Sequence, residues 1–220
     1  VNRFAGYVNL PEMIRIWSSI TDTVLSSEVE DLKSKIPDLS GGKAEDVFLP
    51  QSKTLRSIMK AVKKELQRFD EMDGKEKRRN SHIPLTMFGI AKAAAVDCRL
   101  VMADAPDEPN SKTNACVKRT LEALKESESY KGTVAIFADN YKNDKTGFNV
   151  YEDIKSKLIS SGVPEEQIVI MKSGMSVNKK VEIFDKANAG DIRVLLGSTF
   201  TLGTGVNIQE RLFTLIHLDA

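Results

Sequence analysis

The chain has few of the residues that would point to a disulfide-bonded domain or a metal centre. Its 220 residues include two cysteines, Cys98 and Cys116, and two histidines. The cysteines do not form a Cys-x-x-Cys pair, so the sequence predicts neither a disulfide framework nor a metal site. We expect both thiols to be reduced, as in a cytoplasmic protein.

Long apolar runs and a strong charge imbalance are also missing. No apolar run approaches the roughly 18 residues of a membrane span, and the first residues, VNRFAGYVNLPEM, lack the features of a signal peptide. Lysine and arginine number 32 against 31 aspartate and glutamate residues. This balance excludes a histone-like, tail-driven nucleic-acid binder but leaves a local basic cleft open. We expect a globular cytoplasmic protein with no membrane partner.

Both ends of the sequence indicate a piece of a longer polypeptide. There is no initiating methionine, and the chain stops at LIHLDA, directly after an apolar run typical of a strand. We therefore expect that further parts of the protein are needed for any activity.

From about residue 131 the sequence alternates between strand and helix patterns. Short apolar runs predict strands at 132–139, 167–171, 191–197 and 212–219. A helix is expected at 148–162, capped by Asn149, and another at 176–190, with Val177, Val181, Phe184 and Ala187 on one face. Such alternation, with continuous apolar strands, is typical of an α/β fold with a parallel sheet covered by helices.

The strand ends are expected to form a common binding edge. In open parallel sheets, ligands bind at the carboxyl ends of the strands. The segments after Phe137, Met171, Leu196 and Leu218 should therefore meet along one edge of the sheet.

The first 130 residues predict mostly helices. Helical spacing occurs over 10–25, 52–72, 85–102 and 111–127, with a charged loop at 73–84 and a possible strand at 46–50. Trp17 is expected to pack in a core or interface. We divide the chain into a helical extension (1–47), a helical part of the main lobe (48–130) and an α/β core (131–220).

One dense basic run, GKEKRRN at 74–80, lies in the predicted charged loop. Glu71 and Asp73 precede it and partly cancel its field. A solvated loop is the favoured interpretation, and a DNA contact is the alternative.

The glycine-rich stretch GSTFTLGTGVNIQE (197–210) does not fit the common phosphate-binding motifs. A P-loop requires G-x-x-x-x-G-K-[ST], but this stretch contains no lysine. A dinucleotide fingerprint requires a third glycine at position 208, which is Ile208 here. A connection that only turns the chain remains open.

Residues 131–220 resemble the second RecA-like lobe of superfamily-two helicases and DNA translocases, particularly the Swi/Snf-type branch. The resemblance is carried by an ordered set of motifs: Ile136-Phe137, Ser173-Gly174, Phe184 with Gly190, LLGST at 195–199, GTGVNI at 203–208, and Asp219. It implies a RecA-like parallel sheet sandwiched by helices.

The resemblance also implies two functional faces. Lys172, Ser173, Gly174, Ser198 and Thr199 would contact the DNA backbone, whereas local turn bonding by the two hydroxyls is the alternative. Asp219 would fix the turn leading to the next motif.

A second set of residues would face a nucleotide. Gly203, Gly205 and Asn207 would approach ATP, although Asn207 could instead cap its turn. We assign no role to His217.

Several parts of an ATPase are absent from these 220 residues. There is no lysine-containing phosphate loop, no acidic Mg²⁺ motif and no Q-x-x-G-R arginine motif. The resemblance implies that ATP and Mg²⁺ are bound mainly by a first, N-terminal lobe of the same polypeptide. We expect no catalytic residue here and no ATP hydrolysis by this chain alone. The alternative is a non-catalytic Rossmann-like nucleotide-binding or protein-interaction module.

A looser similarity covers the whole chain. RFAGYVNLPEM (3–13), KAAAVDCRLV (92–101) and SKTNACV (111–117) are similar to helicase regions of large phage and mobile-element proteins, which often carry an adenine methylase. This similarity implies a linked methylase domain as a further partner. Ser111-Lys112-Thr113 departs from the S-G-K-like stretch of Swi/Snf-type proteins.

Overall fold

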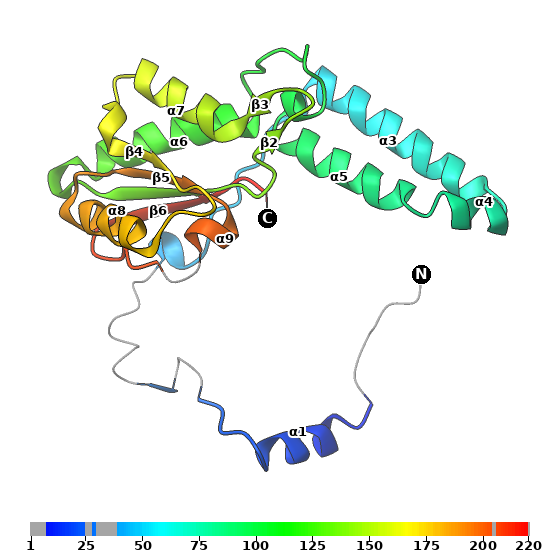
Figure 1. The fold of residues 1–220 in the computed structure, drawn as a ribbon, viewed down its shortest axis with the longest axis horizontal. Coiled ribbons are helices and arrows are strands. Elements are labelled where there is room, and N and C mark those ends of the chain that lie inside the picture. Colours follow the sequence, from blue (N-terminus) through cyan, green and yellow to red (C-terminus); the bar gives the residue numbers. More distant parts are fainter. Residues whose placement is uncertain (1–7, 25–27, 30–38, 204–205, 220) are drawn as a thin grey trace. The chain divides into compact units, whose positions relative to one another are not determined.

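A computed structural model of the chain describes residues 8–24, 28–29, 39–203 and 206–219 (Figure 1). The chain divides into two compact units, Val1–Phe48 and Leu49–Ala220. Among the described residues, no helix combines the length and the apolar content needed to cross a membrane.

Among its described residues, the first unit contains the short amphipathic helix α1 (Leu10–Ser18) and the 3-10 turn η2 (Ser40–Gly42). Helix α1 ends earlier than the predicted 10–25, because the hydroxyls of Ser19 and Thr21 donate to the carbonyls of Ile16 and Trp17. None of its residues is buried, and Trp17 is 62% exposed within the described part of the chain. Trp17 is therefore not part of a core in this unit.

The predicted strand at 46–50 is wrong. The backbone there forms no strand, and the apolar side chains of Val47 and Phe48 are exposed. An apolar run of this length becomes a strand only when a neighbouring strand supplies hydrogen bonds, and none of the described strands lies beside it.

The second unit is built on a four-stranded sheet. Its strands are β1 (Thr133–Phe137), β4 (Ile168–Ile170), β5 (Val194–Gly197) and β6 (Leu212–His217), in the order β4-β5-β1-β6. Every pairing is parallel. The α/β prediction is confirmed: β1 and β5 are buried throughout, as continuous apolar strands between two helix layers should be. The outer strands are less covered, since β4 is partly buried and β6 alternates between half-buried and exposed residues.

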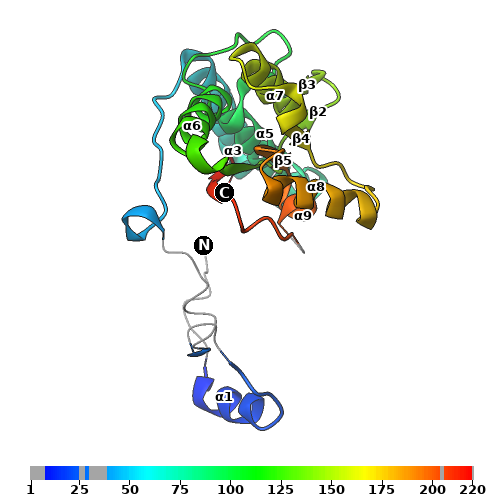
Figure 2. The same ribbon diagram turned by 90° about the vertical axis from the view of Figure 1, so that its left-hand side faces the viewer.

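Helices cover both faces of this sheet (Figure 2). On one face, α6 (Lys112–Glu126) and α7 (Val150–Ser160) pack on Val134, Ile136 and Leu196. On the other, α8 (Val177–Ala189) and the short α9 (Thr199–Leu202) pack on Ala135 and Leu195. Asn149 caps α7 as predicted by accepting from the backbone amides of Tyr151 and Glu152.

The predicted apolar face of α8 is only half correct. Phe184 and Ala187 are buried, but Val177 and Val181 are exposed, and Ile183 takes the remaining core position. The buried residues of α8 lie in its second half, so the two valines of its first half do not reach the core.

A buried arginine supports this core in a way the sequence did not predict. Arg193, at the start of the third core strand, donates to the carbonyls of Gly132 and Leu124 and pairs with Glu128 in η4 (Glu128–Tyr130). Cys98 and Cys116 are free and buried, and burial raises the pKa of Cys116 to about 12.

The segment 141–149 lies between β1 and α7. It forms a two-stranded hairpin of β2 (Lys142–Asn143) and β3 (Phe148–Asn149). A 3-10 turn, η5 (Glu165–Gln167), leads into the second core strand.

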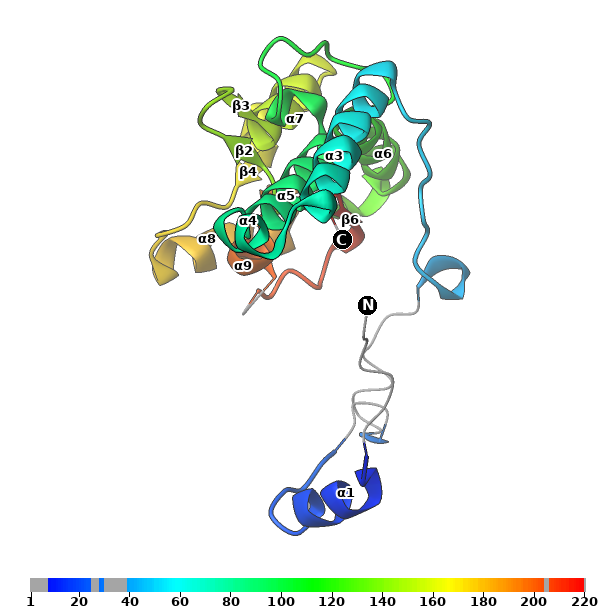
Figure 3. The ribbon, with the colours of Figure 1, turned by 90° about the vertical axis from the view of Figure 1, so that its right-hand side faces the viewer.

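A helical hairpin extends from the sheet domain (Figure 1), and its helices lie in front of the sheet in Figure 3. It consists of α3 (Lys53–Glu71), the short α4 (Gly74–Arg79) and α5 (Ile83–Val96), followed by η3 (Cys98–Leu100). Ile58, Val62 and Ala94 form its core. The predicted loop at 73–84 is wrong, because the Asp73 carboxylate accepts from the amides of Lys75 and Glu76 and starts a helix there.

Candidate functional site

The loops predicted to share an edge do so. Phe137 pairs with both Gly197 and His217, and Ile170 pairs with Leu196, so four strands end at nearly the same level. Because all four strands run in parallel, the segments that follow them leave the same edge of the sheet.

Two aspartates join three of these loops. The Asp219 carboxylate, after β6, accepts from the backbone amides of Asp139 and Asn140 at 2.8 and 2.6 Å, and from the Asn140 side chain at 2.8 Å. The Asp139 carboxylate, after β1, accepts from the Thr199 amide at 2.8 Å and from its hydroxyl at 3.1 Å. Asp219 therefore fixes the turn after β1, although the sequence predicted that it would fix the turn that follows it.

Ser198 and Thr199 begin the short α9 on this edge. The Ser198 hydroxyl accepts from the Thr201 amide, and the Thr201 hydroxyl accepts from the Ser198 amide, which makes a reciprocal capping box. With Thr199 held by Asp139, both hydroxyls take part in local hydrogen bonds, the alternative that the sequence left open. Their contact with DNA stays a prediction.

Gly197 allows this turn to lie directly on the end of its strand. A Cβ at this position would come within 2.8 Å of the Leu202 Cβ and 2.9 Å of the Thr201 hydroxyl. Both distances are shorter than carbon atoms tolerate, so glycine is required here for close packing.

Lys172, Ser173 and Gly174 lie on the same edge, after β4. All three are exposed, and Gly174 has φ 82°, a left-handed conformation that favours glycine. A Cβ at Gly174 would meet no atom within 4 Å, so the space over this turn is open. Within the described chain, Lys172 forms no ion pair.

The structure describes only part of the segment that was predicted to face a nucleotide. Gly203 ends α9 in a right-handed conformation, and a Cβ there would lie 2.5 Å from the Thr199 carbonyl oxygen. Gly205 lies outside the described residues. Asn207 is exposed, and its carbonyl accepts from the Asn188 side chain at 2.9 Å, which ties the loop to the end of α8.

Aromatic residues pack at the strand ends that form this edge. The rings of Phe137 and His217 stack at 4.8 Å, which gives His217 a packing role. The Tyr151 hydroxyl donates to the Ala138 carbonyl, and its ring stacks on Tyr141 at 4.5 Å. Burial raises the pKa of Tyr151, so it stays a neutral donor. Tyr151, Asp139 and Asn140 were not singled out from the sequence.

The described charged clusters do not form a metal centre. No group of three or more histidine, cysteine or acidic side chains within the described ranges is arranged to hold a metal ion. The most carboxylate-rich cluster is neutralised by Arg99, which bonds to Asp97 at 2.9 Å and to Asp107 and Asp153 at 3.1 Å. Lys157 contacts Asp107 and Asp153 at 2.7 Å. The network joins the base of the hairpin to α7.

A cavity of about 360 Å³ lies beside this junction. It is lined by Ala93, Leu100, Asn140 and residues 142–145. No described residue of the glycine-rich stretch 197–210 lines it.

Comparisons with known proteins find a likeness among solved structures but none by sequence. No family model matches the chain, and no curated protein matches it by sequence. Among solved structures, the chain is similar to the Sulfolobus solfataricus SWI2/SNF2 ATPase C-terminal domain, with 15% sequence identity and a TM-score of 0.48. The match covers 74% of this chain and 67% of that one.

Proposed function

We propose that this chain is the second, C-terminal motor lobe of an ATP-dependent DNA helicase or translocase. The observation that carries the proposal is the meeting of the loops after β1, β4, β5 and β6 at one edge of a parallel sheet, where the resemblance to Swi/Snf-type lobes puts the DNA-contacting residues. Asp139 and Asp219 hold three of these loops in register.

The DNA backbone is proposed to lie along Lys172, Ser173, Gly174, Ser198 and Thr199. Lys172 supplies charge, and the open turn at Gly174 leaves space for a phosphate close to the backbone. The Thr199 amide and hydroxyl both point to an acceptor, which is the Asp139 carboxylate here. A phosphate is also an anionic acceptor, so DNA binding would exchange one for the other at Thr199.

The glycine-rich segment is proposed to meet a nucleotide from the opposite lobe. Gly203, Gly205 and Asn207 would approach ATP and Mg²⁺ bound mainly by an N-terminal lobe of the same polypeptide. Closure of the two lobes around ATP would then move the DNA face by one step. A linked adenine methylase would be a further partner of such a protein.

Fluorescence anisotropy with a labelled DNA duplex tests the DNA face. The chain should bind at 50 mM salt, and log K should fall linearly with log salt, because each phosphate contact releases counterions. Lys172→Gln should make the slope less steep by about 0.9, the value for one phosphate contact. Lys118→Gln, an exposed lysine on α6, serves as the control and should leave the slope unchanged.

An absence of binding at 50 mM salt would reject the DNA face and favour the non-catalytic module. ATP turnover gives a second test. The chain lacks the phosphate-loop lysine and the arginine motif, so it should show no ATP-saturable hydrolysis. Measurable turnover by the purified 220 residues would contradict the assignment to a second lobe.

A further inference from the structure

The near-neutral net charge of the chain conceals a strongly basic segment. Residues 53–96, which form the helical hairpin, contain 11 lysine and arginine residues against five aspartate and glutamate residues. The rest of the chain contains 21 basic and 26 acidic residues. Positive charge is thus concentrated on one structural element.

Helix α3 sorts this charge onto one side. At 3.6 residues per turn, six basic residues fall within an arc of about 140°. The apolar residues that face α5, such as Ile58 and Val62, occupy the opposite arc. We call the outward arc the basic face of α3; its basic members are Lys53, Arg56, Lys60, Lys63, Lys64 and Arg68. One acidic residue, Glu71 in the last turn, lies on the same arc, so the face keeps a large excess of positive charge.

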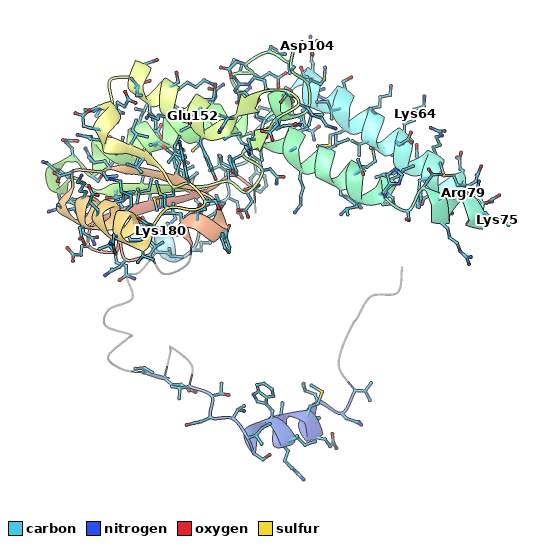
Figure 4. All side chains as sticks on the ribbon, viewed as in Figure 1. Lys64, Lys75, Arg79, Asp104, Glu152 and Lys180 are labelled. Atoms are coloured by element: carbon cyan, nitrogen blue, oxygen red, sulfur yellow. The ribbon has the colours of Figure 1, made fainter. Side chains whose placement is uncertain are left out.

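The charges of this face are available to a partner. All six side chains are exposed, and Arg68 alone among them forms an ion pair within the described residues, with Glu65 at 3.5 Å. The row continues at the tip of the hairpin, where Lys75, Arg78 and Arg79 of α4 are also exposed (Figure 4). Elsewhere, Arg99, Lys157 and Arg193 are neutralised by carboxylates.

The geometry of the row fits a nucleic-acid backbone better than a protein or a lipid surface. From Lys53 to Arg68 it extends about 22 Å at 1.5 Å per residue, and duplex DNA presents one phosphate per roughly 1.7 Å of its axis. No large apolar side chain shares this face, since those of α3 lie on the opposite arc, so it lacks the anchors of a protein interface and the apolar stripe of a membrane-bound helix.

We infer that the basic face of α3, continued by the tip at α4, binds the phosphate backbone of duplex DNA as a site separate from the sheet edge. The inference deepens the proposed function, because it adds a second contact to the DNA that the motor lobe would hold. The binding is independent of base sequence, since the face consists of flexible cationic side chains that contact phosphates rather than base edges.

Paired variants test the site on the whole 220-residue chain. Lys60→Gln/Lys64→Gln removes two neighbouring charges from α3, and Lys118→Gln/Lys125→Gln removes two exposed charges from α6 as a matched control. In duplex anisotropy, the α3 variant should bind about tenfold more weakly at 50 mM salt, with a slope less steep by about 1.8. The control should stay within twofold of wild type.

The same titration separates this site from the sheet edge. Affinity lost in the α3 variant but not in Lys172→Gln supports the hairpin site and rejects the sheet-edge face. The opposite pattern rejects the hairpin site alone. If polyglutamate displaces the labelled duplex as well as unlabelled duplex does at matched charge, the assignment to DNA is overturned. It is also overturned if Lys60→Gln/Lys64→Gln binds the duplex within twofold of the control variant. A chain that binds no duplex at 50 mM salt overturns both proposals.

Discussion

The sheet edge and the helical hairpin use charged residues in opposite ways. At the edge, the carboxylates of Asp139 and Asp219 accept hydrogen bonds from residues of other loops, and each bond serves the fold. On the hairpin, the lysines of α3 have no ionic partner among the described residues and make no fold contact through their charge. Charge with an internal partner orders loops, whereas charge without one is free to attract a ligand.

Among the changes that test this difference, Asp219→Ala should have the largest effect on stability. Asp219→Ala removes three hydrogen bonds to a carboxylate and leaves the amides of Asp139 and Asn140 without that partner. The free energy of unfolding should fall by about 3 kcal/mol, measured by urea denaturation. Lys64→Gln, on the exposed face of α3, is the control and should change it by less than about 0.5 kcal/mol. Equal stability of the two variants would show that the carboxylate does not hold the edge together.

A methyl group at Gly197 should have the next largest effect. Gly197→Ala places a Cβ 2.8 Å from the Leu202 Cβ, so α9 must move away from its strand. A loss of about 2 kcal/mol is expected in the same denaturation experiment. Gly147→Ala, in the open β2–β3 turn, is a poor control because Gly147 has φ 72°, a left-handed conformation that is strained for alanine. Gly89→Ala is the better control, since a Cβ there meets no atom within 4 Å and α5 should be stabilised slightly. Full retention of stability in Gly197→Ala would contradict the close-packing role.

Removing the exposed carboxylate of Asp139 should lower the stability of the chain and raise its affinity for DNA. Asp139→Ala removes two hydrogen bonds to Thr199 and should cost about 1 kcal/mol of stability, because the site is exposed. It also removes a negative charge from the proposed DNA face, so duplex affinity at 50 mM salt should rise by roughly threefold. Weaker DNA binding by this variant in the anisotropy titration would contradict the exchange of carboxylate for phosphate at Thr199.

The smallest expected effect is the pH dependence at Asp107. Burial alone would raise the pKa of this carboxyl, but hydrogen bonds from Lys157 and Asn114 and the charge of Arg99 hold it below its usual value. Because the pKa of Asp107 is lower in the folded state than in the unfolded state, its carboxylate stabilises the fold at any pH above the ordinary pKa of about 3.9. This stabilisation is lost as the pH falls through the folded-state pKa. Asp107→Asn should therefore reduce the loss of stability between about pH 5 and pH 3 in urea denaturation. An unchanged pH profile would contradict this role.

The α/β core could be predicted from the sequence because its signals are local. Apolar runs and helix caps, such as Asn149 and Ser176, mark the elements from residue 131 onward. The failures come from long-range packing: a short apolar run at 46–50 lacks a strand partner, and Val177 and Val181 follow helical spacing beyond the edge of the sheet.

The candidate site was harder to predict for the same reason. Gly197, Ser198 and Thr199 belong to a motif that can be read directly from the chain. Asp139 and Asp219 are 80 residues apart, and their shared role depends on the parallel registers that bring β1 and β6 side by side. The basic face of α3 could have been predicted from helical spacing, but its lysines are spread along the helix, whereas the run at 74–80 is contiguous and was the one singled out.

Hydrogen–deuterium exchange of the chain with and without a DNA duplex at 50 mM salt tests the account most directly. The account predicts that DNA protects two separate segments, the hairpin residues 53–79 and the edge residues 172–174 with 198–203. Helix α7, on the face of the sheet away from α8, should exchange equally in both conditions. Protection of neither segment, or protection confined to α7, would contradict it.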